Sequence, residues 1–180
     1  MKYLLMTGLI LLGLNAMSQI KRVTLQASGL TCSMCSKAVK TALEDVPFVE
    51  KVQVDIKNQQ YNLSFKDAAQ VELDELSKAV EDAGFSVASL KVTASVENLQ
   101  VARDQHVKIG NSYFHFLNAA GKLLDGEASF NIVDKAYVPA KEFKKFSGMT
   151  KMKCMQTGKS EACCNSGELQ AGTRVYHAIL

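Results

Sequence analysis

The sequence predicts an α+β protein with the element order β-α-β-β-α-β in its first half and mostly strands in its second. In residues 21–92 the spacing of apolar side chains switches between a period of two and a helical period of roughly 3.6. Pro47 and Gly84 follow the two helical patterns, where a helix-breaking residue and a C-terminal glycine are expected. In the second half the strand-like pattern prevails.

The first half contains four strand patterns and two helical ones. The strands alternate apolar and polar residues, and each helix carries its apolar residues on one face. In chain order these elements are a strand over residues 23–27, a helix over 33–45, strands over 52–56 and 61–65, a helix over 73–83 and a strand from about 85 toward 92. This is the order of the split β-α-β, or ferredoxin-like, sandwich.

The second half predicts a small, mostly-β domain. Gly110-Asn111 and Ala120-Gly121 supply turn residues between its early strands. The predicted elements are strands over residues 101–109, 112–117, 128–133, 135–138 and 173–179, with a short helix over 140–146. A compact all-β unit such as an OB-like barrel fits this pattern.

The N-terminus has the features of a signal peptide. Lys2 precedes an apolar run from Tyr3 to Leu14, and Ala16-Met17-Ser18 offers small residues for cleavage. The run is shorter than the about 20 residues that span a bilayer. We therefore expect a signal peptide at residues 1–18, a periplasmic or secreted mature chain without stable membrane insertion, and domains at 19–93 and 94–180.

Composition excludes several classes of protein. Apolar residues make up 47% of the 180 residues and charged residues 22%, as in ordinary soluble globular proteins. The net charge of +3 comes without a nucleic-acid-binding motif, so we expect no nucleic-acid partner. No Ser-His-Asp or paired-carboxylate pattern is present, so we expect a binding protein and not an enzyme.

A Cys-x-x-Cys motif, Cys32 to Cys35, lies between the first strand and the first helix. Cys35 falls in or beside the first helical turn, where free N–H groups and the helix dipole stabilise a thiolate. Two thiolates on one short loop suit a soft ion of low coordination number such as Cu(I), with Hg(II) or Zn(II) as other candidates. A closed zinc site would need four ligands, and no second pair follows at finger spacing. We predict that Cys32 and Cys35 bind the metal and that Met34, between them, points to solvent.

Residues 21–92 resemble the heavy-metal-associated domain family of copper chaperones, P-type ATPase metal-binding domains and periplasmic mercury-binding proteins. The resemblance rests on the element order, on Gly29-Leu30-Thr31-Cys32-Ser33-Met34-Cys35 and on Ala83-Gly84-Phe85. Where this chain has Leu30 the family usually has Met, a replacement that conserves volume. The resemblance implies that Cys32 and Cys35 are the ligands and that Phe85 shields the metal without binding it. A plain core position for Phe85 is an equal alternative.

The predicted function is that of an extracytoplasmic metallochaperone for a soft metal, foremost Cu(I). It would act by thiolate ligand exchange with a metal-transporting P-type ATPase or another copper-accepting protein. Two alternatives stay open. One is a mercury-binding scavenger, and the other is a thiol-disulfide oxidoreductase that uses Cys32 and Cys35 as a redox pair. A thioredoxin-like enzyme also needs a proline facing the motif, whereas Pro47 is better placed to end the first helix.

A second cysteine cluster lies near the C-terminus. Cys154, Cys163 and Cys164 occur in a stretch that also contains Met149, Met152 and Met155. Because the predicted compartment is oxidising, we expect a disulfide between Cys154 and either Cys163 or Cys164, with a second soft-metal site as the alternative. A single histidine on a strand is more often structural than a ligand. The predicted metal site therefore leaves out His106, His115 and His177.

Overall fold

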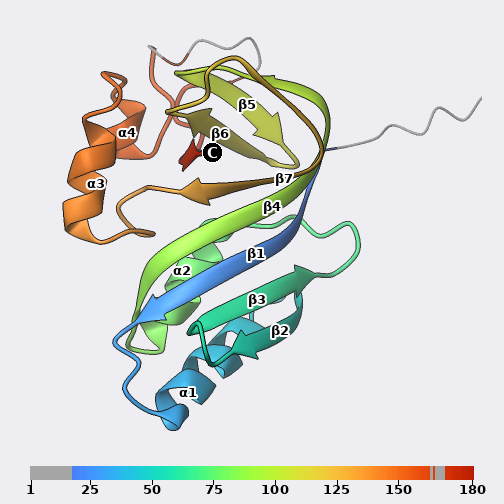
Figure 1. Ribbon diagram of the computed structural model, residues 1–180, viewed down its shortest axis with the longest axis vertical. Helices are drawn as coiled ribbons and strands as arrows, with labels where there is room; N and C mark the ends of the chain where they lie inside the picture. The colour runs from blue at the N-terminus through green and yellow to red at the C-terminus, as the bar shows by residue number, and fades with distance from the viewer. Residues whose placement is uncertain (1–17, 163, 165–168) are drawn as a thin grey trace, which may run out of the picture.

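Eight strands form one mixed sheet in the order β2-β3-β1-β4-β7-β8-β6-β5 (Figure 1). The computed structural model describes residues 18–162, 164 and 169–180. The strands are β1 (Gln19–Ser28), β2 (Val49–Asp55), β3 (Gln60–Phe65), β4 (Ser86–Val101), β5 (Gln105–Ile109), β6 (Ser112–Phe116), β7 (Lys122–Ile132) and β8 (Val175–Ile179).

The first half has the predicted ferredoxin-like arrangement. Strand β1 pairs antiparallel with β3 and β4, β2 pairs with β3, and α1 (Ser33–Glu44) and α2 (Leu73–Asp82) cover one face (Figure 1). Alternate side chains of β1 are buried under the helices, as the period of two predicts. One end differs: Ile56 was expected in β2, but β2 stops at Asp55 and Ile56 lies 84% exposed in the turn.

Gly84 ends α2 as the sequence predicts. Its φ of +86° is the left-handed conformation that only glycine adopts without strain. The amide of Gly84 donates to the carbonyl of Glu81 at 2.9 Å, and the amide of Phe85 donates to the carbonyl of Val80 at 3.1 Å. This Schellman motif turns the chain sharply and fixes where Phe85 and β4 begin.

Strand β4 runs on past Val92 to Val101, from one half into the other. It pairs with β1 through Ser95 and with β7 from Leu90 to Val101. The domain boundary predicted at 93/94 falls inside this strand. Buried residues of both halves form one hydrophobic cluster, so the halves share a sheet and a core.

Strands β5 to β8 extend this sheet, and the OB-like barrel is not confirmed. β7 lies antiparallel to β4 and β8, and β6 pairs parallel with β8. Only residues 102–104 connect β4 to β5, although three strands separate them in the sheet order. Three residues reach only about 10–14 Å, so the sheet must curve back until β5 lies near the end of β4.

Other predictions for the second half had mixed outcomes. The helix expected over 140–146 is α3 (Ala140–Ser147). The strand expected over 135–138 is wrong, because these residues form a turn in which the amide of Tyr137 bonds to Asp134. The strand expected over 101–109 is divided by the 102–104 turn, and the one-turn helix α4 (Cys154–Thr157) was not predicted.

Asp74, in α2, ties the first half to the second. Arg174 donates to both its carboxylate oxygens, at 2.7 and 3.0 Å, and the hydroxyl of buried Tyr137 donates at 2.7 Å. Burial raises the pKa of Asp74, but the hydrogen bonds from Arg174 and Tyr137 outweigh it and hold the pKa below its usual range. The carboxylate is therefore ionised at neutral pH and links α2 to the C-terminal part of the chain.

Residues 1–17 of the expected signal peptide lie outside the described residues, so the signal peptide stays a prediction. Within the part of the chain that is described, no helix has the length and apolar character needed to cross a bilayer.

Candidate metal centre

Cys32 caps the N-terminus of α1. Its backbone is extended, at φ −152° and ψ 165°, and its Sγ accepts a hydrogen bond from the amide of Cys35 at 3.4 Å. The side chain thus takes the place of the Ser, Thr or Asp that usually caps a helix. This local geometry turns both cysteines toward the same end of the helix.

The two predicted ligands lie side by side. Their Sγ atoms are 2.9 Å apart, Cys32 is exposed and Cys35 is partly exposed. Hydrogen bonds from the Cys32 side chain and from the backbone of Thr31 lower the pKa of the Cys35 thiol. The site therefore offers a thiol that ionises more readily than a free cysteine and that solvent or a partner can reach without first unfolding the loop.

Contacts with the sheet hold the start of α1 in place. The Ser36 and Tyr61 hydroxyls lie 3.0 Å apart, and Tyr61, buried in β3, also donates to the Ser36 carbonyl at 3.3 Å. Leu30 packs against the main core, as expected for a residue that replaces Met without loss of volume. The loop is thereby fixed at both ends while its sulfur atoms stay accessible.

Met34 is exposed as the sequence predicts, and Phe85 packs on the core beside Gly29. A Cβ added at Gly29 would come within 3.8 Å of Cδ1 of Phe85. The ring therefore lies beside the start of the loop that carries Cys32 and Cys35 (residues 29–35, the metal loop), and it packs on the core. Met34 is 70% exposed and points to solvent. A shielding role for Phe85 stays a prediction.

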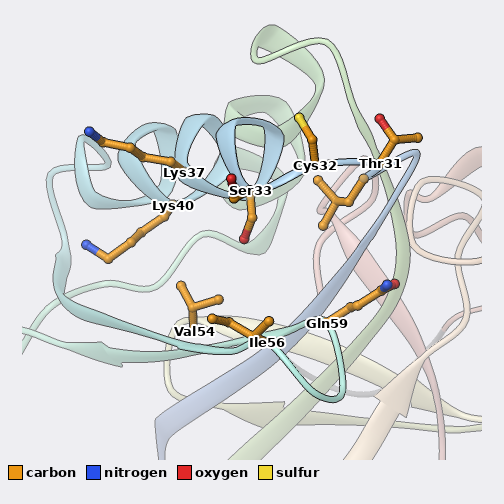
Figure 2. A pocket seen from close by; sticks show the side chains of 10 residues that line it. Thr31, Cys32, Ser33, Lys37, Lys40, Val54, Ile56 and Gln59 are labelled. Atoms are coloured by element: carbon orange, nitrogen blue, oxygen red, sulfur yellow. The ribbon is translucent and has the colours of Figure 1, made fainter.

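A groove of about 430 Å³ opens next to Cys32, between α1 and the β2–β3 hairpin. Figure 2 shows Cys32 and two lysines on the helix side, and Val54 and Ile56 facing them from the hairpin. The apolar floor and the ammonium groups of Lys37 and Lys40 make this a surface on which a partner protein can lie against the cysteines.

All three histidines of the chain meet in a second cluster. Strand register places His106 opposite His115 and His115 opposite His177, across β5, β6 and β8. Cys154, at the start of α4, points its Sγ at this row, 3.7 Å from His106 Nε2, 3.6 Å from His115 Nδ1 and 3.4 Å from His177 Nε2. All four residues are buried.

Burial favours the neutral form of two histidines in this cluster. It lowers the pKa of His115 to about 4, with the nearby His177 and His106 adding to the effect. Burial also lowers the pKa of His106. Both imidazoles are therefore neutral at pH 7.

The sequence reasoning left these histidines out, although one signal could have found two of them. The predicted turn at Gly110-Asn111 pairs Ile109 with Ser112, and the same register places His106 opposite His115. Residues opposite each other in adjacent strands share a face. The parallel pairing with β8 that adds His177 joins segments about 60 residues apart and has no local signal.

The disulfide predicted for Cys154 stays a prediction. Cys163, one of its two possible partners, lies outside the described residues. Two of the methionines near Cys154 have clear surroundings. Met155 is buried and Met149 is partly buried in a small apolar cluster under α3 and α4, which agrees with a packing role for both.

Comparisons with known proteins cover the first half of the chain. The heavy-metal-associated domain matches residues 24–86, which include Cys32 and Cys35. Copper chaperone CopZ of Bacillus subtilis is 35% identical over 69 residues, which is 38% of this chain and 99% of the chaperone. The mercuric transport protein periplasmic component of Pseudomonas aeruginosa is 41% identical over 63 residues, 35% of this chain and 68% of that protein. A probable copper-exporting P-type ATPase of Archaeoglobus fulgidus is 31% identical over 78 residues, 42% of this chain but only 10% of the ATPase.

Proposed function

The chain belongs to the heavy-metal-associated domain family through residues 24–86, and from this premise we propose that it is an extracytoplasmic carrier of a soft metal ion, foremost Cu(I). The observation that carries the proposal is the pair of accessible sulfur atoms of Cys32 and Cys35, 2.9 Å apart at the start of α1. The extracytoplasmic location rests on the signal-peptide features of residues 1–18.

The chemistry is ligand exchange between thiolates. An ion held linearly by bonds of about 2.3 Å would keep two sulfur atoms about 4.6 Å apart. Cys32 and Cys35 must therefore move apart when they bind it, which their exposed position in the first helical turn allows. A partner's thiolate then enters the open side to give a transient three-coordinate ion, one of the two carrier cysteines leaves, and a second partner thiolate displaces the other. Only metal–sulfur bonds form and break between the thiolates, so a general acid or base is not needed.

The partner we propose is a metal-transporting P-type ATPase or another copper-accepting protein. A relative named as a probable copper-exporting P-type ATPase supports this class. The groove beside Cys32 supports it physically, because Lys37 and Lys40 favour an acidic partner surface and the apolar floor favours close contact.

Mercury is the second candidate cargo. The relative named as a mercuric transport protein periplasmic component has higher identity than the chaperone, over a shorter stretch. Two thiolates suit Hg(II) as well as Cu(I), so the donor set alone does not choose between the ions. Competition between the two metals for the reduced protein tests this choice.

The decisive experiment for a carrier is transfer. Reduced protein loaded anaerobically with one equivalent of Cu(I) is mixed with the metal-free metal-binding domain of a copper-exporting ATPase, the proteins are separated, and copper is counted on each. We expect copper to distribute between them without release to a weak chelator, and the Cys35→Ser variant to fail. If copper stays on the carrier while Cys32 and Cys35 exchange rapidly with glutathione disulfide, the redox alternative replaces this proposal.

A further inference from the structure

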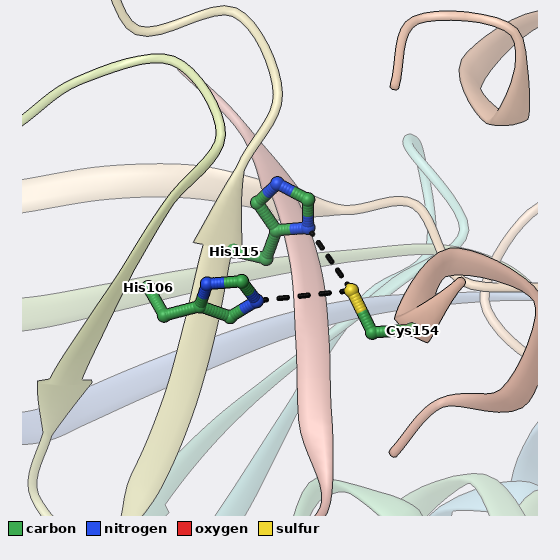
Figure 3. Close-up of side chains that lie close together, drawn as sticks. All are labelled: His106, His115 and Cys154. Carbon is green, nitrogen blue, oxygen red and sulfur yellow. Dashed lines mark hydrogen bonds between the residues drawn. The ribbon is translucent and has the colours of Figure 1, made fainter. Parts of the chain in front are cut away.

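The side chains around Cys154 have the composition of a metal site that is separate from the metal loop. Three imidazoles and one thiol converge, from β5, β6, β8 and α4. Figure 3 shows two of the imidazoles, those of His106 and His115, directed at the sulfur of Cys154. The ligand atoms of His106, His115 and Cys154 all lie within 4.8 Å of one another. His177 approaches the same sulfur from the far end of the histidine row.

The sulfur–nitrogen distances are those that a small ion requires. Tetrahedral bonds of about 2.3 Å to sulfur and about 2.0–2.1 Å to nitrogen place each nitrogen about 3.6 Å from the sulfur. Cys154 Sγ lies 3.4 to 3.7 Å from the three nitrogens. The imidazole nitrogens would have to come closer to one another, to about 3.3 Å, when an ion binds.

Carboxylates stand behind two of the imidazoles. Asp104 Oδ1 lies 3.1 Å from His115 Nε2, and Asp134 Oδ1 lies 2.7 Å from His177 Nδ1. The nitrogen that faces Cys154 is the opposite one in each ring, Nδ1 in His115 and Nε2 in His177. A carboxylate on the far nitrogen is the arrangement that orients metal-binding histidines and raises their basicity.

We propose that, in the reduced protein, His106, His115, His177 and Cys154 form a second, closed metal site for a borderline-soft ion of the Zn(II) type. Imidazole and thiolate are the ligands that zinc prefers, and four protein ligands leave no open position. Because every ligand is buried, the ion would be a resident one that holds α4 against β5, β6 and β8. It would differ in this respect from the exchangeable cargo on Cys32 and Cys35.

A thiol nucleophile explains the cluster less well. Cys154, His177 and Asp134 do have the order of a thiol–imidazole–carboxylate triad. However, Cys154 and His177 are each 0% exposed, and a nucleophile must reach its substrate. Such a triad also gives no role to the two further imidazoles against the same sulfur.

The test uses the full chain under reducing conditions, with the substitutions Cys32→Ser and Cys35→Ser. These two changes remove the thiol ligands of the metal loop. Co(II) serves as a visible probe for the zinc site. We expect one equivalent of Co(II) to bind with the strong visible absorption of a tetrahedral ion and a thiolate charge-transfer band, and Zn(II) to displace it. Adding Cys154→Ser should abolish the charge-transfer band.

A second variant covers the case in which Cys154→Ser fails to fold. Asp104→Asn keeps the shape of a partly exposed side chain, and its φ of 58° is one that Asn accepts. It should weaken Zn(II) binding by about 10–100-fold, whereas Asp67→Asn, the same charge change at an exposed residue in the first half of the chain, should leave the affinity unchanged. The proposal is overturned if the reduced protein binds no Co(II), if a bound Co(II) lacks the thiolate band, or if both Asp variants bind Zn(II) alike.

Discussion

Replacing Asp74 by Ala should destabilise the whole molecule, because Asp74 joins its two halves. The change leaves the fully buried hydroxyl of Tyr137 without its acceptor, which costs about 1–3 kcal/mol. It also removes the ion pair between Asp74 and Arg174. Because the two side chains are 51% and 30% exposed, this pair stabilises the fold by about 1 kcal/mol or less. We expect a total loss of about 1–4 kcal/mol in the free energy of unfolding.

A double-mutant cycle with Tyr137→Phe isolates the buried part of this cost. In the Asp74→Ala protein, Tyr137→Phe removes the hydroxyl that has lost its acceptor. The double variant should therefore lose about 1–2 kcal/mol less stability than the sum of the two single-variant losses. Urea denaturation measures all four proteins, with Asp67→Ala as a control at an exposed site. Additive effects within about 0.5 kcal/mol would refute the link, and so would separate unfolding of the two halves in the parent protein.

Three further outcomes test the loop and the helix ends. Gly84→Ala should cost about 1–2 kcal/mol because φ is +86° there, while Gly148→Ala, at φ −77°, should be neutral or slightly stabilising; urea denaturation of both shows whether the left-handed turn matters. Alkylation of Cys35, followed by mass spectrometry, should have its pH midpoint below that of an unstructured cysteine peptide, since hydrogen bonds lower the pKa of this thiol; a midpoint at or above the peptide value contradicts this. Protein with a Cys32–Cys35 disulfide should not bind Cu(I) until reductant restores the thiolates, so equal affinity in both forms would place the function elsewhere.

The sequence predicts the first half well because its signals are local. Alternating residues define β1, Pro47 limits α1, and Gly84 provides the left-handed turn after α2. The position of Cys32 and Cys35 at a helix start follows from the same patterns. Each of these features depends on residues only a few positions apart, which is the range over which periodicity and capping act.

The strand order of the second half could not be predicted in this way, because it depends on pairing between segments that are far apart in the sequence. β8 inserts between β6 and β7, and β4 continues past the expected boundary because β7 is available to pair with it. Nothing near Cys154 in the sequence indicates that its neighbours are His106, His115 and His177. Only the fold brings these four residues together, so a cluster that looked like a disulfide clip with three unrelated histidines has the donor set of a metal site.

The most direct measurement of the central claim is the affinity of the reduced protein for one equivalent of Cu(I), set by competition with a chromophoric chelator. Cys32→Ser and Cys35→Ser should each lower it by more than the about 10–100-fold that loss of an outer-shell partner costs, with the circular dichroism of the folded protein retained. Met34→Leu, between the two cysteines but 70% exposed, should leave it unchanged. Parent-like affinity in both cysteine variants would contradict the assignment of Cys32 and Cys35 as the metal ligands.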